Sequence, residues 1–177
     1  MTSKRIKQLK LLLDDVVYKE IASPVGVLTL FASDKGVHRV LWEHERYTET
    51  CEALLGRFKQ LATHPMLLEA EAQLDAYFLG KRQAFDLPLV LEGTAFQKQA
   101  WHVLSQIPYG QTISYAEQAT NLGDKNKARA VGLANGSNPI SIIVPCHRVV
   151  GSNGQLTGFG GGVERKAFLL QLEGISR

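Results

Sequence analysis

The chain has 177 residues, 45% of them hydrophobic, and a formal net charge of +3. This length can bury a core in one domain or in two small ones, and no apolar run reaches the ~20 residues that a membrane-spanning helix needs. The two cysteines are too few for a disulfide framework or a four-cysteine zinc site, so we expect a globular, cytoplasmic protein whose thiols are reduced.

The first half of the chain predicts a small sheet followed by helices. Three short runs rich in β-branched and aromatic residues, separated by turn residues, are typical of an antiparallel meander. These runs span residues 17–21, 26–32 and 37–42. Apolar residues at helical spacing then predict helices over 47–62 and 66–79. Residues 83–93 are expected to connect the two halves.

The second half predicts mostly helix. Thr94 is a favourable N-cap for the first helix, and Ser114 with Glu117 three residues later forms a capping box for the second. A Gly-containing turn separates the second helix from the third, and this pair is typical of a helix-turn-helix. The four predicted helices span residues 95–105, 115–122, 125–136 and 163–173.

Charge and side-chain size indicate what the second half binds. Residues 97–177 hold 8 Lys and Arg against 4 Asp and Glu, whereas residues 1–96 hold 12 against 13. The basic half favours a polyanionic partner. Small residues alternate from Ala128 to Ala134 in the third predicted helix. They would let a backbone approach closely but offer base edges no hydrogen-bonding groups, which argues against strong sequence readout.

The segment Pro145-Cys146-His147-Arg148-Val149 is the most informative in the chain, because it places a thiol beside an imidazole. The thiolate is the nucleophilic form, so a neighbouring base that accepts the thiol proton is typical of a reactive cysteine. It follows an apolar run, residues 140–144. If the backbone stays extended, Cys146 and His147 point to opposite faces, and a bend or a bridging water must connect them. The alternative is a buried structural thiol.

The imidazole needs a carboxylate to orient it, and few acids occur in this half. Glu173 closes the last predicted helix, where it could fold back on the core. Glu164 begins the same helix and suits its dipole better. The acids of the second half are Glu117, Asp124, Glu164 and Glu173.

Several further segments belong with this motif: Gly93–Gln97, Ile107–Gly110, Ser114–Tyr115, Ala128–Gly132, Asn135–Pro139, Pro145–Val149 and Leu172–Gly174. With them the chain resembles the O6-alkylguanine-DNA alkyltransferases (methylated-DNA–protein-cysteine methyltransferases). The resemblance covers essentially the whole second half and extends more loosely over Ile21–Gly26. It implies an α+β (α/β) fold. A ribonuclease-H-like N-terminal domain with an antiparallel sheet would span residues 1–92, and a DNA-binding alkyltransferase domain with the helix-turn-helix would span 93–177.

The resemblance implies direct reversal of DNA damage. A damaged guanine rotates out of the duplex, and Cys146 takes its alkyl group in one irreversible turnover. A relay of Cys146, a water, His147 and Glu173 activates the thiol, and Asn138 braces the active-site turn. The implied partner is double-stranded DNA carrying O6-alkylguanine, with O4-alkylthymine as a second candidate. We expect a monomer without a cofactor and, with only Cys51 in the first half, without the structural zinc of some relatives.

Five more positions match residues that contact DNA or substrate in the family. Arg129 matches an arginine that fills the gap left by the extruded base, and Tyr115 a tyrosine that pushes the flanking phosphate and donates to guanine. Val149 matches the residue whose backbone carbonyl accepts from guanine's amino group, and Ser152 a phosphate-binding serine. Gly160 stands where some relatives carry a serine, and its backbone N–H would donate to O6 instead.

Two other functions fit parts of the pattern. A non-catalytic sensor of alkylated bases would share the helix-turn-helix and the basic half, but it would not need Cys146 with His147 and Glu173. A cysteine hydrolase would transfer an acyl group to Cys146 and find an oxyanion hole in the Gly-rich loop, residues 151–162. It would not need the arginine-bearing helix of small residues. Alkylation of the thiol distinguishes the transferase from the sensor.

Overall fold

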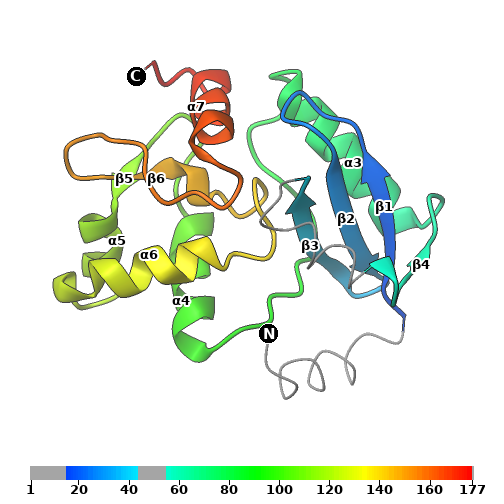
Figure 1. Ribbon diagram of the computed structural model, residues 1–177, viewed down its shortest axis with the longest axis horizontal. Coiled ribbons are helices and arrows are strands. Elements are labelled where there is room, and N and C mark those ends of the chain that lie inside the picture. The colour runs from blue at the N-terminus through cyan, green and yellow to red at the C-terminus, as the bar shows by residue number, and fades with distance from the viewer. Residues whose placement is uncertain (1–14, 44–54, 177) are drawn as a thin grey trace.

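The computed structural model describes residues 15–43 and 55–176, which form two lobes (Figure 1). The first lobe is a sheet covered by helix α3, and the second holds helices α4 to α7 (Figure 1). Every helix in these ranges is too short or too polar to traverse a bilayer. The arrangement confirms the predicted fold class of a small sheet domain followed by a mostly helical one.

The first lobe is built on a four-stranded sheet in the order β3-β2-β1-β4. β1 (Val17–Ile21), β2 (Leu28–Ser33) and β3 (Gly36–Trp42) pair antiparallel, which confirms the predicted meander. β2 is buried along its whole length because it lies between two strands and under α3. The fourth strand is parallel to β1, so the complete sheet is mixed rather than purely antiparallel.

The predicted helix over 47–62 is wrong at its C-terminal end, the part that the structure describes. The helix expected over 47–62 does not continue to its end, because Lys59–Gln60 forms β4 at the edge of the sheet. Phe58 packs edge-on against Phe31 of β2, with ring centroids 5.6 Å apart. This aromatic contact anchors the segment beside β1, where its backbone pairs as a strand. Cys51 and most of the predicted helix lie outside the described residues.

Helix α3 (Pro65–Phe78) lies across one face of the sheet and confirms the helix predicted over 66–79. His64 caps it, since its Nδ1 accepts from the Met66 N–H at 3.2 Å. Pro65 suits the first turn, where its missing N–H would have no intrahelical partner. The buried side of the helix carries Leu67, Ala70, Gln73, Leu74 and Tyr77.

Helices of the second lobe begin where the capping residues predict. Thr94 and Ser114 each accept from the backbone N–H three residues on, and the side chains of Gln97 and Glu117 accept from the N–H of the cap. The pair α5 and α6 confirms the helix-turn-helix. The elements are α4 (Ala95–Ser105), β5 (Ile113–Ser114), α5 (Tyr115–Asn121), η1 (Lys125–Lys127), α6 (Ala128–Gly136), η2 (Cys146–Arg148), β6 (Val149–Val150) and α7 (Val163–Leu172).

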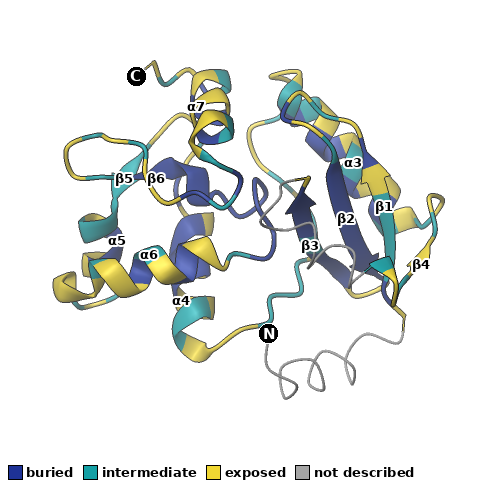
Figure 2. Cartoon of the chain, in the orientation of Figure 1, coloured by how far each residue is buried: buried dark blue, intermediate teal, exposed yellow. Residues whose placement is uncertain are grey.

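The two lobes share a continuous core. The Val40 N–H of β3 donates to Pro139 O at 2.9 Å, and Val40 pairs with Ile140. Buried side chains of both lobes belong to one apolar cluster that includes Cys146. Figure 2 shows the buried residues concentrated in β2, β3 and the central segments of the second lobe. The first lobe therefore packs directly against the segment that leads to Cys146.

Candidate active site

Cys146 lies at the start of a tight turn rather than in an extended segment. The apolar run before it reverses on itself: Val144 N–H donates to Ile140 O at 2.9 Å, and Ser141 pairs with Val144. Ile142 takes a left-handed φ of 73°, a strain of about 1–3 kcal/mol for a residue of this kind. The structure therefore has the bend that the sequence left open, because the run folds back on itself through local hydrogen bonds and η2 follows at once.

Asn138 braces this turn with both ends of its amide. Its Nδ2 donates to Val144 O at 2.8 Å and to Cys146 Sγ at 3.2 Å, while its Oδ1 accepts from the Ile140 N–H at 3.0 Å. The cysteine is only 6% exposed. A donor aimed at sulfur stabilises the thiolate more than the thiol, so Asn138 positions Cys146 and acts to lower its pKa.

His147 and Glu173 form a buried pair beside the thiol. His147 Nε2 lies 2.8 Å from Glu173 Oε1, and both side chains are inaccessible to solvent. An ionised carboxylate can only accept, so Nε2 carries the proton and Nδ1 keeps its lone pair. Within residues 15–43 and 55–176, Nδ1 has no hydrogen-bond partner. It is thus the ring nitrogen available to take a proton.

Glu173 has partners that the sequence does not predict. Arg148 donates from Nε to Oε2 at 2.9 Å and from Nη2 to Oε1 at 3.0 Å, and the Gly110 N–H donates to Oε2 at 3.2 Å. The Tyr77 hydroxyl, from the first lobe, donates to Oε1 at 2.7 Å. Sequence analysis missed Tyr77 because its helical spacing is that of an ordinary core residue. For Arg148 the only signal is its place in the Pro145–Val149 motif.

The electrostatics of this cluster follow from burial and from these hydrogen bonds. Burial alone would raise the pKa of Glu173, but the hydrogen bonds from His147 and Arg148 and the positive charge of Arg148 outweigh it and lower that pKa to about 2. Burial lowers the pKa of His147 despite its bond to Glu173. Burial also raises the pKa of Cys146, against the opposing effects of Asn138 and of the positive charge of Lys166. Near neutral pH the carboxylate is therefore charged, while the imidazole and the thiol are neutral.

We expect Glu173 to make the protein sensitive to acid between about pH 4.5 and about pH 2. Its folded pKa is depressed from 4.5 to about 2, so its contribution is complete above the unfolded pKa and is lost as the pH falls towards the folded one. The full shift corresponds to roughly 3 kcal/mol of unfolding free energy. Urea titrations across this range measure the loss. Glu173→Gln should be less stable near neutral pH and should lose less unfolding free energy across this pH range. If the unfolding free energies of the two proteins fell in parallel with pH, Glu173 would not be the source of the acid sensitivity.

Tyr115 and Lys166 fasten the Gly-rich loop beside the thiol. The Tyr115 hydroxyl donates to Thr157 O at 2.9 Å, and Lys166 Nζ donates to Thr157 O at 3.0 Å and to Val149 O at 2.5 Å. The ammonium lies 5.8 Å from the centroid of the Tyr115 ring. Lys166 is fully buried and sequence analysis missed it, since a lysine on a terminal helix ordinarily predicts a solvated side chain.

The remaining candidates lie nearer the surface. Arg129 is exposed in the first turn of α6, and Ser152 is exposed at the start of the Gly-rich loop. Gly160 is partly buried further along that loop. The structure thus brings Cys146, His147, Glu173 and Asn138 together and leaves Arg129 and Ser152 facing solvent. Among the described residues, no group of three His, Cys, Asp or Glu side chains is placed to hold a metal ion.

Two family models match the chain. The one described as 6-O-methylguanine DNA methyltransferase, DNA binding domain, matches residues 95–175. The one described as 6-O-methylguanine DNA methyltransferase, ribonuclease-like domain, matches residues 16–91. Together the two models cover most of the described residues of both lobes.

Relatives of known name match over nearly their whole length. The methylated-DNA–protein-cysteine methyltransferase of Methanosarcina acetivorans is 44% identical over 158 residues, which are 89% of this chain and 97% of the relative. The protein of the same name from Mycobacterium tuberculosis H37Rv is 48% identical over 156 residues, 88% of this chain and 91% of the relative. The crystal structure of the M. tuberculosis O6-methylguanine methyltransferase has a TM-score of 0.80 at 45% identity, covering 89% of this chain and 92% of that one. The structure of M. tuberculosis OGT in complex with DNA has a TM-score of 0.77, with the same identity and coverage.

Proposed function

The chain belongs to the 6-O-methylguanine DNA methyltransferase family, and on that premise we propose that Cys146 is the residue that accepts the alkyl group. The activity of the family is DNA repair by methyl transfer to a protein cysteine. The observation that carries the assignment is the buried thiol itself. It accepts from Asn138 and is followed by an imidazole whose Nε2 is held by Glu173.

Before the reaction the Cys146 thiol and the His147 imidazole are both neutral. The Cys146 proton passes through a bridging water to His147 Nδ1, the ring nitrogen that has no hydrogen-bond partner among the described residues. Glu173 stays ionised and stabilises the imidazolium that forms. Because Arg148 and Tyr77 bind the same carboxylate, the oxygen facing His147 stays in place as the proton arrives. The buried pair is therefore pre-arranged for one proton transfer.

The thiolate then attacks the alkyl carbon on O6 of the damaged guanine. A sulfur–carbon bond forms as the carbon–oxygen bond breaks, and guanine leaves with that electron pair and takes up a proton. The thioether that results is stable, so each molecule acts once. Val149 O accepts from guanine's amino group with the lone pair that its bond from Lys166 leaves free. The Gly160 N–H donates to O6.

Duplex DNA lies along α6, on the surface that carries Arg129. Extrusion of the base costs a few kcal/mol, and less for a lesion that pairs badly. Arg129 fills the gap in the base stack, and the small residues beside it let the helix approach the minor groove closely. Tyr115 exchanges its bond to Thr157 O for contacts to the flanking phosphate and guanine, and Ser152 binds a second phosphate. The M. tuberculosis relative has been crystallised in complex with DNA, which supports DNA as the partner.

We also propose that the chain is divided into two domains with different roles. Residues 1–92 form the ribonuclease-H-like N-terminal domain, and residues 93–177 form the alkyltransferase domain that binds DNA. The ranges matched by the two family models, 16–91 and 95–175, support a boundary at this place. The protein acts as a monomer on DNA and needs no cofactor for the displacement.

Repair of DNA can be measured at a restriction site that one O6-methylguanine blocks. Incubation with the protein should restore cleavage, up to one duplex for each protein molecule. A matched duplex with O4-methylthymine tests the second substrate. Restored cleavage well beyond one event per molecule would contradict single turnover. Lesion-selective binding without restored cleavage would favour the sensor instead.

A further inference from the structure

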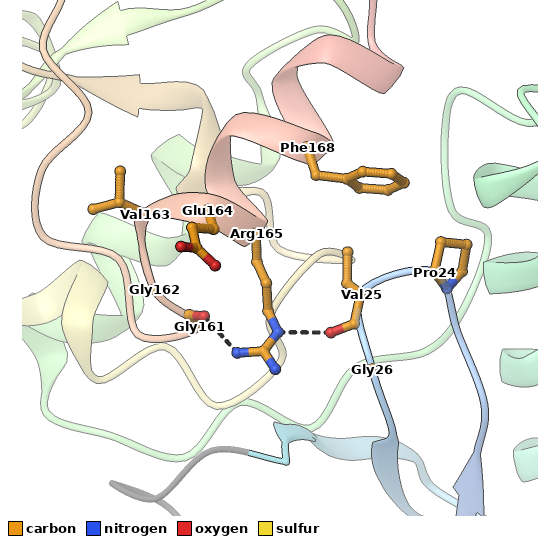
Figure 3. A pocket seen from close by; sticks show the side chains of 9 residues that line it. All are labelled: Pro24, Val25, Gly26, Gly161, Gly162, Val163, Glu164, Arg165 and Phe168. Carbon is orange, nitrogen blue, oxygen red and sulfur yellow. Dashed lines mark hydrogen bonds between the residues drawn. The ribbon is translucent and has the colours of Figure 1, made fainter.

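Arg165 joins three segments that are distant in the sequence. Its guanidinium donates to Val25 O at 2.6 Å, to Gly161 O at 3.0 Å and to Glu43 O at 3.3 Å. Val25 lies in the turn after β1, Glu43 follows β3, and Gly161 belongs to the Gly-rich loop. Figure 3 shows Arg165 reaching from α7 between this loop and the β1–β2 turn. One side chain of the second lobe thus fastens the loop to the first lobe.

Trp42 of β3 makes the second contact between the loop and the first lobe. The Arg165 guanidinium lies 5.8 Å from the centroid of its ring, and the Phe159 ring packs edge-on against it at 5.6 Å. Trp42 is 3% exposed and Phe159 8%. A Cβ added at Gly161 would come within 2.8 Å of both rings, so the backbone there has no room to shift towards the first lobe.

The same loop is also held by two residues that interact electrostatically with the thiol, Tyr115 and Lys166. Thr157 O is held by Tyr115 and Lys166, and a Cβ at Gly158 would lie 3.2 Å from the Tyr115 hydroxyl. Phe159 belongs to the same apolar cluster as Cys146. The loop is therefore held at Thr157 by Tyr115 and Lys166, and at residues 159–161 by Arg165 and by Trp42 of the first lobe.

We propose that Arg165 and Trp42, here called the loop anchor, limit the size of the alkyl group that reaches Cys146. The inference rests on the proposed function, in which the Gly160 N–H meets O6 and the alkyl group lies beside residues 159–161. Close packing on both sides leaves the loop a single position, and that position defines one wall of the alkyl pocket. The first lobe thereby acts as a specificity determinant, and Arg165 as a positioning residue that does not touch the reacting atoms.

The test compares single-turnover transfer from duplexes that differ only in O6-methylguanine or O6-benzylguanine. Arg165→Ala frees the loop, so the methyl rate should fall about tenfold through misplacement of the pocket wall. The benzyl rate should fall much less, and the methyl-to-benzyl ratio should therefore drop severalfold. Arg165→Lys keeps the charge but loses the planar guanidinium that spans several carbonyls. Its methyl-to-benzyl ratio should therefore lie between those of the unaltered protein and Arg165→Ala. Amide hydrogen exchange of residues 157–161 should be slowest in the unaltered protein, faster in Arg165→Lys and fastest in Arg165→Ala.

Arg82→Ala is the matched control, because the half-buried Arg82 side chain donates to the nearby Ala84 O within the first half of the chain and should leave the ratio unchanged. Equal losses on both substrates, tracking a loss of stability in urea, would overturn the proposal and reduce Arg165 to a structural role. An unchanged ratio with unchanged loop exchange would overturn it as well. Failure of the unaltered protein to transfer either group would instead refute the proposed function, so the two outcomes are separable.

Discussion

Replacing Cys146 with alanine should abolish alkyl transfer while leaving the affinity for duplex DNA within about twofold. The sulfur is the atom that forms the new bond, and the hydroxyl or amine groups nearby cannot replace a thiolate at neutral pH. DNA affinity should persist because contacts to phosphates dominate it, whereas Cys146 is buried and only 6% exposed. Asn138 keeps its bond to Val144 O in the variant, so the turn should hold its shape.

Transfer is measured in a single turnover, and affinity by fluorescence anisotropy at one fixed salt concentration. Cys146→Ser is the matched control, since its hydroxyl can still accept from Asn138 but remains a weak nucleophile without a far stronger base. Both variants should bind the lesion and leave it chemically intact. Residual transfer by Cys146→Ala above the level of a protein-free reaction would remove this residue from the proposed role.

Arg129→Ala should slow transfer from duplex DNA by roughly 100-fold but change the reaction with free O6-benzylguanine by less than about threefold. The extruded base leaves a gap in the stack, and without the side chain that fills it the free-energy cost of extrusion rises by a few kcal/mol. A rise of 1.4 kcal/mol corresponds to a tenfold slower reaction. The free base needs no extrusion. Arg129 is exposed on α6, so its removal should not disturb the core.

The control for Arg129 is Lys125→Ala, which removes another exposed cation near α6. It should weaken DNA binding slightly and lower the slope of log affinity against log salt by about one unit, without a specific effect on extrusion. The comparison uses rates at saturating protein, where a loss of affinity no longer contributes. Equal loss on duplex and free base for Arg129→Ala would show that the residue acts on the chemistry or the fold and not on base extrusion.

The parts of the fold that were predicted correctly are those with local signals. The capping boxes at Thr94 and Ser114 mark helix starts because each is completed within four residues. β4 was missed because its strand pairing depends on β1, some 40 residues earlier, and no local pattern records that pairing. The reversal at Ile142, just before Cys146, was not predicted for a similar reason, because an apolar run predicts burial and not the path of its backbone.

The candidate site shows the same limit. Cys146 and His147 are adjacent in the chain and could be identified from the sequence, and Glu173 was the acid best placed to fold back. Tyr77 reaches Glu173 across 96 residues, and Arg165 reaches Val25 across 140. Such contacts arise only when the lobes pack together, so composition and spacing contain no signal for them. The contribution of the first lobe to the active site therefore became visible only in three dimensions.

Mass spectrometry of the intact protein shows whether Cys146 itself receives the alkyl group. After incubation with a duplex carrying one O6-methylguanine, we expect the protein to gain ~14 Da, the difference between a thiol and its methyl thioether. Peptide mapping should place it on Cys146, and the gain should stop at one event per molecule. An unchanged mass, or a methyl group mapped to any other residue, would mean that Cys146 is not the alkyl acceptor.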